Sequence, residues 1–185
     1  MRGPAYVPTN VFISQLICIP FRFSLLPALS SDGIIFSDIR EGTYNGVAFI
    51  EYIEHLLAHM NPWPERCSVL VMDNCSIHHL DDIAPLCASR SVHNVTPESV
   101  IWLIMSHSGV RLYYLPPYSP DYNPIEEAFS YIKSVIQWNG AEFRLAVDKK
   151  NLHGVHYLLH NALATITPEK AQGWMGHSGY LCTET

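Results

Sequence analysis

Residues 68–73 read Ser68-Val69-Leu70-Val71-Met72-Asp73, an unbroken apolar run that ends in a carboxylate. A short run of this kind is typical of a strand that is buried on both faces of a sheet. Open α/β sheets bind their ligands at the carboxyl ends of their strands. We therefore expect Asp73 to lie at the edge of a sheet where a ligand can bind.

A second carboxylate follows a predicted strand over Val110–Leu115, in the stretch Pro116-Pro117-Tyr118-Ser119-Pro120-Asp121-Tyr122-Asn123-Pro124-Ile125-Glu126-Glu127. The prolines end the strand, and Asn123-Pro124 predicts the start of a helix that runs to about Trp138. If Asp73 and Glu126 converge to within roughly 4–7 Å, they can share Mg²⁺, which prefers oxygen ligands. Two such ions can activate water and stabilise the leaving oxygen in phosphodiester hydrolysis.

Each of these residues also has a purely structural interpretation. An aspartate after a strand often only bonds the turn that follows it. Glu126 comes three residues after Asn123, which fits a capping box. Glu127 lies about 100° further round the helix and would face solvent or a DNA strand.

The rest of the chain predicts a mixed sheet with helices on its faces. Apolar runs on either side of Asp32-Gly33 indicate a β-hairpin over residues 23–39, and residues 11–19 are strand-like. The expected helices cover residues 47–60 with Asn45 as N-cap, a short stretch from about Leu80, residues 153–165 and a stretch from Pro168.

The composition is that of a globular protein, with 48% hydrophobic and 15% charged residues. The five cysteines are dispersed, which favours reduced thiols over a disulfide framework or a zinc cluster. No apolar run reaches the roughly 18 residues of a membrane span, so we expect an intracellular protein that is not secreted. The net charge of −6 argues against a simple DNA-binding module.

The two motifs together carry a resemblance to a known family. The stretches Met72–His78 and Leu115–Phe129 resemble the DDE endonuclease domain of Tc/mariner-type transposases. The resemblance implies a ribonuclease H-like α/β fold, a mixed sheet flanked by helices with a C-terminal helical tail. It implies metal-dependent DNA strand cleavage and transfer, Mg²⁺ or Mn²⁺ as cofactor, DNA as partner, a homodimer, and a nuclear or cytoplasmic location.

The same resemblance assigns roles to residues of this chain. Asp73 matches the second family carboxylate and Glu126 the third, so both are expected to be catalytic and to bind the metal. The other candidates would support those carboxylates or contact DNA; they are Asn74, His78, Tyr118, Asn123 and Glu127.

One family feature is missing. The first family carboxylate should lie on a strand before the hairpin, yet residues 1–31 contain no Asp or Glu. The only candidate strand there offers Ser14 and Gln15 as its polar groups, and Asp32 and Asp38 belong to the hairpin itself. The family's helix-turn-helix DNA reader is also missing. We therefore expect a fragment, a decayed copy or a mis-joined gene product that does not cut DNA.

The two motifs are also further apart than in the family, which indicates an insertion near residues 88–105. Such a segment is expected to pack poorly against the core, because long loops cost little entropy. The expected organisation is an irregular segment over residues 1–22, the endonuclease domain over residues 23–140 and a helical tail over residues 141–185.

Three alternatives remain open at this point. The chain could be a domesticated, non-catalytic remnant that binds nucleic acid or protein. It could be an unrelated metal-dependent hydrolase that uses Asp73, His78 and Glu126. Finally, His153, His156 and His160 share one helix face and could bind zinc, although a polar face is the commoner role for such histidines.

Overall fold

The computed structural model describes residues 10–14, 16–18, 23–73, 83–89, 109–149 and 151–180. The chain divides into two compact units, each built from two separate stretches of sequence. The first unit comprises residues 1–14 and 44–119, and the second comprises residues 15–43 and 120–185. The three consecutive segments expected from the sequence stay a prediction.

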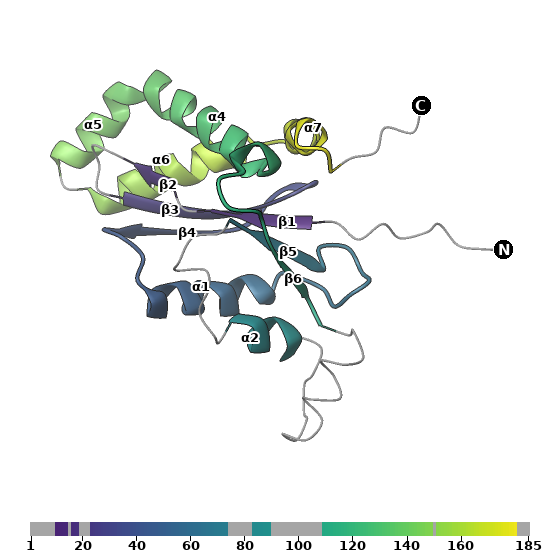
Figure 1. Ribbon diagram of the computed structural model, residues 1–185. Helices are drawn as coiled ribbons and strands as arrows, with labels where there is room; N and C mark the ends of the chain where they lie inside the picture. Colours follow the sequence, from purple (N-terminus) through teal and green to yellow (C-terminus); the bar gives the residue numbers. More distant parts are fainter. Residues whose placement is uncertain are drawn as a thin grey trace. The chain divides into compact units, whose positions relative to one another are not determined.

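Three parallel strands form the centre of the first unit (Figure 1): β1 (Asn10–Ile13), β5 (Val69–Met72) and β6 (Arg111–Tyr114). β5 lies between the other two, and all four of its residues are buried. A strand enclosed in this way needs apolar side chains on both faces, which explains the unbroken apolar run in the sequence. The predicted strands ending at Met72 and near Leu115 are thus confirmed.

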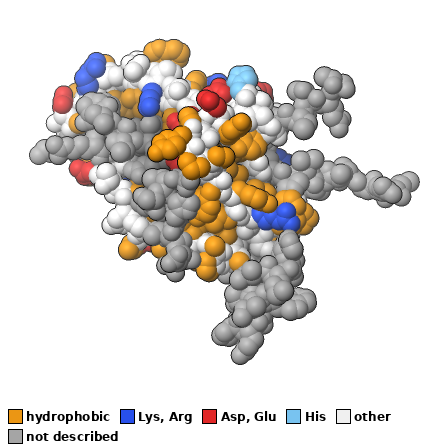
Figure 2. Space-filling view, viewed as in Figure 1, with side chains coloured by type: hydrophobic (Ala, Val, Ile, Leu, Met, Phe, Trp, Pro, Cys, Tyr) orange, Lys and Arg blue, Asp and Glu red, His pale blue; other side chains and the backbone are white. Residues whose placement is uncertain are grey.

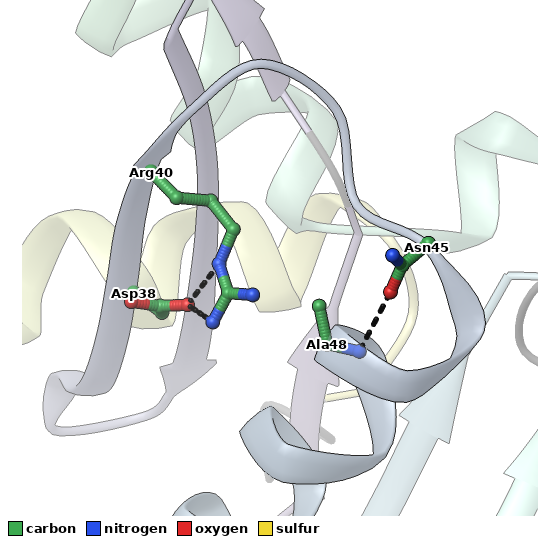
Figure 3. Close-up of polar contacts among 4 residues, drawn as sticks. All are labelled: Asp38, Arg40, Asn45 and Ala48. Carbon is green, nitrogen blue, oxygen red and sulfur yellow. Dashed lines mark hydrogen bonds and ion pairs between the residues drawn. The ribbon is translucent and has the colours of Figure 1, made fainter.

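Two described helices complete the first unit, α1 (Gly46–Leu57) and α2 (Ile83–Ser89), and α2 lies against both α1 and β6. Asn45 is the N-cap of α1, as predicted, and its side-chain oxygen accepts the Ala48 N–H at 2.9 Å (Figure 3). The helix buries one apolar face, made of Phe49, Tyr52, Ile53, Leu56 and Leu57. Cys87 of α2 is also buried, and its burial raises the pKa of the thiol to about 12.

The second unit contains the predicted hairpin, formed by β3 (Phe23–Ser30) and β4 (Gly33–Glu41), and β2 (Leu16–Cys18) pairs antiparallel with β3. Gly33 has φ of +106°, and a Cβ there would lie 3.0 Å from the Ile166 carbonyl oxygen. The turn therefore requires glycine both for its backbone angle and for its close packing. On β4, the Arg40 guanidinium binds Asp38 through Nε at 2.8 Å (Figure 3).

Among the described residues, the second unit also contains four α-helices and one 3₁₀ turn: η2 (Pro120–Tyr122), α4 (Ile125–Trp138), α5 (Gly140–Asp148), α6 (Leu152–Ala164) and α7 (Pro168–His177). α4 contacts the other three helices, and α6 and α7 also lie against β4. The helices at α4, α6 and α7 are confirmed. Sequence reasoning missed α5, whose weak apolar face buries only Phe143 and Ala146.

The N-terminal stretch differs from expectation. Residues 11–19 were expected to form one strand, but they contribute to two, β1 in the first unit and β2 in the second. The single-strand prediction was wrong because the two halves pair differently, β1 parallel with β5 and β2 antiparallel with β3. An apolar run alone does not reveal such a change of partner.

Several expectations lie largely outside the described residues. Leu80, the expected start of the short helix, is not among them, and α2 is described from Ile83. Of the expected insertion, only Ala88 and Ser89 are described, at the end of α2, so its loose packing stays a prediction. Among the residues that are described, no helix is long and apolar enough to span a membrane.

Candidate active site

Asp73 lies where the sequence places it, directly after the buried strand β5. β1 runs parallel beside β5 with Ile13 opposite Met72, so the residues that follow the two strands emerge at the same edge. The residue after β1 is Ser14, whose Oγ donates a hydrogen bond to Asp73 Oδ2 at 3.1 Å. Ser14 is buried and Asp73 is half-buried. The strand end thus presents a carboxylate beside a hydroxyl.

Glu126 lies in the first turn of α4 and lines a pocket of about 340 Å³. The pocket lies entirely within the second unit. Its lining residues are mostly polar and come from the η2–α4 segment and from the end of α7: Pro120, Asp121, Asn123, Glu126, Glu127, Ser130, His177 and Ser178. Three of them are carboxylates, and the N-terminus of α4 partly offsets the negative charge of Glu126 and Glu127.

The capping-box interpretation of Glu126 is wrong. α4 begins at Ile125 with Pro124 as its N-cap, and no side chain makes a capping hydrogen bond. Glu126 donates its backbone N–H to the Asn123 carbonyl oxygen at 3.1 Å, so Asn123 stands one residue before the cap and its side chain cannot act as one. The Asn123 Oδ1 atom is buried and has no hydrogen-bond partner among the described residues.

Glu127 was expected to face solvent or DNA, and in part it does. Its side chain is 41% exposed, but both carboxylate oxygens also lie 3.2 Å from Nδ1 of His177 on α7. Sequence reasoning did not assign a role to His177, because the contact joins helices that are distant in the sequence. The pair ties the end of α7 to the first turn of α4.

Tyr118 is the most exposed of the predicted site residues, with its side chain fully in solvent. Its φ is +57°, a left-handed conformation that residues other than glycine seldom adopt. Backbone strain of this kind is often found at functional sites. The other two candidates, Asn74 and His78, lie outside the described residues.

Asp73 and Glu126 belong to different compact units, so their predicted convergence stays a prediction. Among the described residues, no group of three or more His, Cys, Asp or Glu side chains could hold a metal ion. The oxygen donors that are present fit Mg²⁺ or Mn²⁺ in kind, since Mg²⁺ is often held by only one or two carboxylates together with water and substrate phosphate. The number of carboxylates fits the ion less well, because the residue beside Asp73 is the neutral Ser14 and not a second carboxylate.

The zinc interpretation of the tail histidines finds no support among the described residues. All three side chains lie on α6, and they do not form a metal-binding group. The His156 ring packs edge-on against Phe23, with ring centroids 5.8 Å apart. That contact gives His156 a packing role within the second unit.

Basic side chains form no continuous track among the coloured residues on the face drawn in Figure 2. The Lys and Arg side chains there are scattered, while hydrophobic side chains are prominent. The Arg111 guanidinium lies 3.6 Å from the centroid of the Trp63 ring and is engaged in a cation–π contact.

A family model described as DDE superfamily endonuclease matches residues 20–146. No curated protein matches the chain in sequence. A chain of the simian T-cell lymphotropic virus intasome, in complex with PP2A regulatory subunit B56 gamma, is similar in structure with a TM-score of 0.55 and 16% identity. That similarity covers 89% of this chain but 50% of the other, so this chain spans about half its length.

Other solved structures are also similar. The catalytic core domain of BIV integrase gives a TM-score of 0.51 at 15% identity, covering 93% of this chain and 98% of that one. The Mos1 transposase catalytic domain, solved with Raltegravir and Mn, gives 0.45 at 14% identity over 94% and 84% of the two chains, a level that supports no conclusion. The integrase match confirms the expected ribonuclease H-like α/β fold.

Proposed function

This chain belongs to the DDE superfamily endonucleases, and we propose that it is a Tc/mariner-type transposase domain that binds DNA but is catalytically incomplete. The family activity would be metal-dependent cleavage and transfer of DNA strands. The observation that carries the proposal is the strand end of the first unit, where Asp73 is paired with the neutral Ser14 instead of a second carboxylate.

Asp73 and Glu126 are the residues that would hold Mg²⁺ or Mn²⁺. The bound ion would supply a polarised water and charge stabilisation for phosphodiester chemistry. Within the chain itself, Ser14 orients the Asp73 carboxylate, and Asn123 lines the pocket beside Glu126. With a hydroxyl where a carboxylate would stand, the chain offers less negative charge to hold two Mg²⁺ ions.

A nicking assay tests the proposed loss of cleavage. The purified chain is incubated with supercoiled plasmid and Mg²⁺ or Mn²⁺, beside the Asp73→Ala variant. We expect the fraction of nicked plasmid to be equal for the two proteins and no higher than without protein. Nicking by the parent chain that the Asp73→Ala variant lacks would overturn catalytic incompleteness.

A second function, nucleic-acid binding without chemistry, is favoured by the fully exposed, strained Tyr118. Stacking of a base on an aromatic side chain contributes about 1–3 kcal/mol. We expect Tyr118→Ala to weaken binding of a labelled single-stranded oligonucleotide, measured by fluorescence anisotropy, by about tenfold. The matched control is Tyr157→Ala, since Tyr157 is also well exposed but lies on α6. Equal losses from both variants would remove Tyr118 from the interface.

The proposal extends to the surroundings of the protein. A transposase-type domain acts on chromosomal DNA, so we propose a nuclear location. We also propose that the protein forms a homodimer. Light scattering during size-exclusion chromatography measures the oligomeric state, and a monomer at micromolar concentration would contradict the dimer.

A further inference from the structure

The strand end of the first unit pairs two side chains by backbone geometry alone. β1 and β5 are parallel and in register from Asn10 opposite Val69 to Ile13 opposite Met72. Continuing that register by one residue places Ser14 opposite Asp73, and the 3.1 Å hydrogen bond between Oγ and Oδ2 joins them. Any residue at position 14 would therefore have its side chain beside the Asp73 carboxylate.

The environment makes this pairing specific. Ser14 is only 5% exposed, and the three β1 residues before it, Val11, Phe12 and Ile13, are fully buried. A side chain held in this way cannot turn away into solvent, and a buried hydroxyl needs a hydrogen-bond partner. At 3.1 Å the bond is longer than the roughly 2.5–2.7 Å of a strong hydroxyl–carboxylate bond. It therefore orients the Asp73 carboxylate without the strength of a short, charge-assisted bond.

We propose that Ser14 is the positioning residue for Asp73 and sets the divalent-cation affinity of this strand end. The hydroxyl fixes the direction of the carboxylate, but it adds no charge. The pair therefore offers a cation one negative charge where two carboxylates would offer two. The inference rests on the proposed function only for the class of ligand, a hard divalent cation.

The charge at position 14 should govern affinity strongly. Two unit charges about 4 Å apart interact by several kcal/mol at the effective dielectric constant of a protein surface. Repulsion between two carboxylates and the cost of burying the new one offset part of that gain. We therefore expect Ser14→Asp to tighten Mn²⁺ binding by at least about tenfold, a change of about 1.4 kcal/mol.

The test measures Mn²⁺ binding to the full chain, without DNA, by isothermal titration calorimetry and by loss of the free Mn²⁺ signal in electron paramagnetic resonance. Ser14→Asp should bind at least about tenfold more tightly than the parent chain. Ser14→Asn, similar in size but uncharged, should stay within about threefold of the parent. The double variant Ser14→Asp, Asp73→Ala should lose the gain. An equal gain with Asn, or no gain with Asp, would overturn the proposal.

Two further variants test whether the Ser14 hydroxyl positions Asp73. Ser14→Ala should weaken Mn²⁺ binding by about threefold to tenfold, because the carboxylate loses its orienting donor, whereas Ser14→Thr, which keeps a hydroxyl, should restore the affinity. Unchanged affinity in Ser14→Ala would show that the hydroxyl does not position Asp73.

Folding and function are checked separately. In Ser14→Asp, repulsion should lower Tm without metal, and Mn²⁺ should raise Tm by more than it does in Ser14→Asn. If Ser14→Asp does not fold without metal, refolding in Mn²⁺ but not in chelator supports the same conclusion, and failure to fold in both overturns it. DNA binding of the parent chain is measured in parallel. Its absence would remove the proposed function but leave the cation result intact.

Discussion

Asp73 follows a strand whose own side chains are all buried and apolar, whereas Glu126 lines a pocket formed mostly by polar residues. Around Asp73, β5 and the last three residues of β1 contribute only buried hydrophobic side chains before the chain reaches the edge. Around Glu126, the lining includes two further carboxylates, the His177 ring and a buried amide oxygen with no partner among the described residues. Burial therefore fixes the first position, and charge and hydrogen bonding shape the second.

The difference indicates how each half can change. A strand end that is held by close packing keeps its geometry when one side chain at the edge is replaced, so a carboxylate can be lost there without loss of the fold. A polar pocket at a helix start depends on the balance of its charges, and each substitution alters that balance. The predictions below test these two expectations in turn.

The largest effect is expected from the apolar support of the strand end. Phe12 is fully buried on β1, two residues before Ser14. Phe12→Ala should lower the free energy of unfolding by about 3–5 kcal/mol, because a buried phenyl ring leaves a cavity. Urea denaturation followed by circular dichroism measures the loss. Val47→Ala, at a 70% exposed position on α1, is the control. Similar values for both variants would mean that β1 contributes little to the fold.

The next effect is a loss of stability at alkaline pH. Burial raises the pKa of the Cys87 thiol to about 12, against about 8.5 for an unfolded cysteine. The folded protein therefore keeps its thiol proton over a range where the unfolded chain releases it, and stability must fall as pH rises from about 8.5 towards 12. Between pH 8 and pH 10 the loss should be about 1–2 kcal/mol. The burial of Tyr114, which raises the pKa of its phenol, adds a loss of the same sign.

The control for the alkaline effect is Cys87→Ala. It should be less stable than the parent at pH 8, because it leaves a small cavity, yet its unfolding midpoint in urea should decline less steeply between pH 8 and pH 10. An identical decline in both proteins would show that Cys87 is not the titrating group.

Strands and the principal carboxylates could be read from the sequence because each depends on local chemistry. β5 is a continuous apolar run. The hairpin has Gly33, with its positive φ, in its turn, and Glu126 follows a loop stiffened by prolines. The pairing of Ser14 with Asp73 could not be read, since it depends on which strand lies beside β5. The contact between Glu127 and His177 joins two helices for the same kind of tertiary reason. The sequence had offered Ser14 and Gln15 as the polar groups of the N-terminal strand, and the register with β5 decides that Ser14 is the one beside Asp73.

In the polar pocket, a smaller effect of opposite sign is expected at Asn123. Its buried Oδ1 has no partner among the described residues, and a buried acceptor without one costs about 1–3 kcal/mol. Asn123→Leu should therefore raise the free energy of unfolding by about 1 kcal/mol. Asn139→Leu is the control, because the Asn139 side chain donates to the Val135 carbonyl at 2.9 Å and its loss should destabilise. A destabilised Asn123→Leu protein would indicate that the amide already has a structural role.

The smallest effect should come from the pair of Glu127 and His177. The His177 side chain is 74% exposed and that of Glu127 is 41% exposed, and ion pairs in such positions contribute about 0.2–1 kcal/mol. A double-mutant cycle with Glu127→Gln and His177→Ala should give a coupling energy within that range at low salt. The coupling should vanish in 1 M NaCl, where the Debye length is about 3 Å. A coupling above about 2 kcal/mol that persists in salt would mean that water is excluded from the pair. The pocket beside Glu126 would then be held as firmly as the strand end beside Asp73, and the contrast between the two positions would disappear.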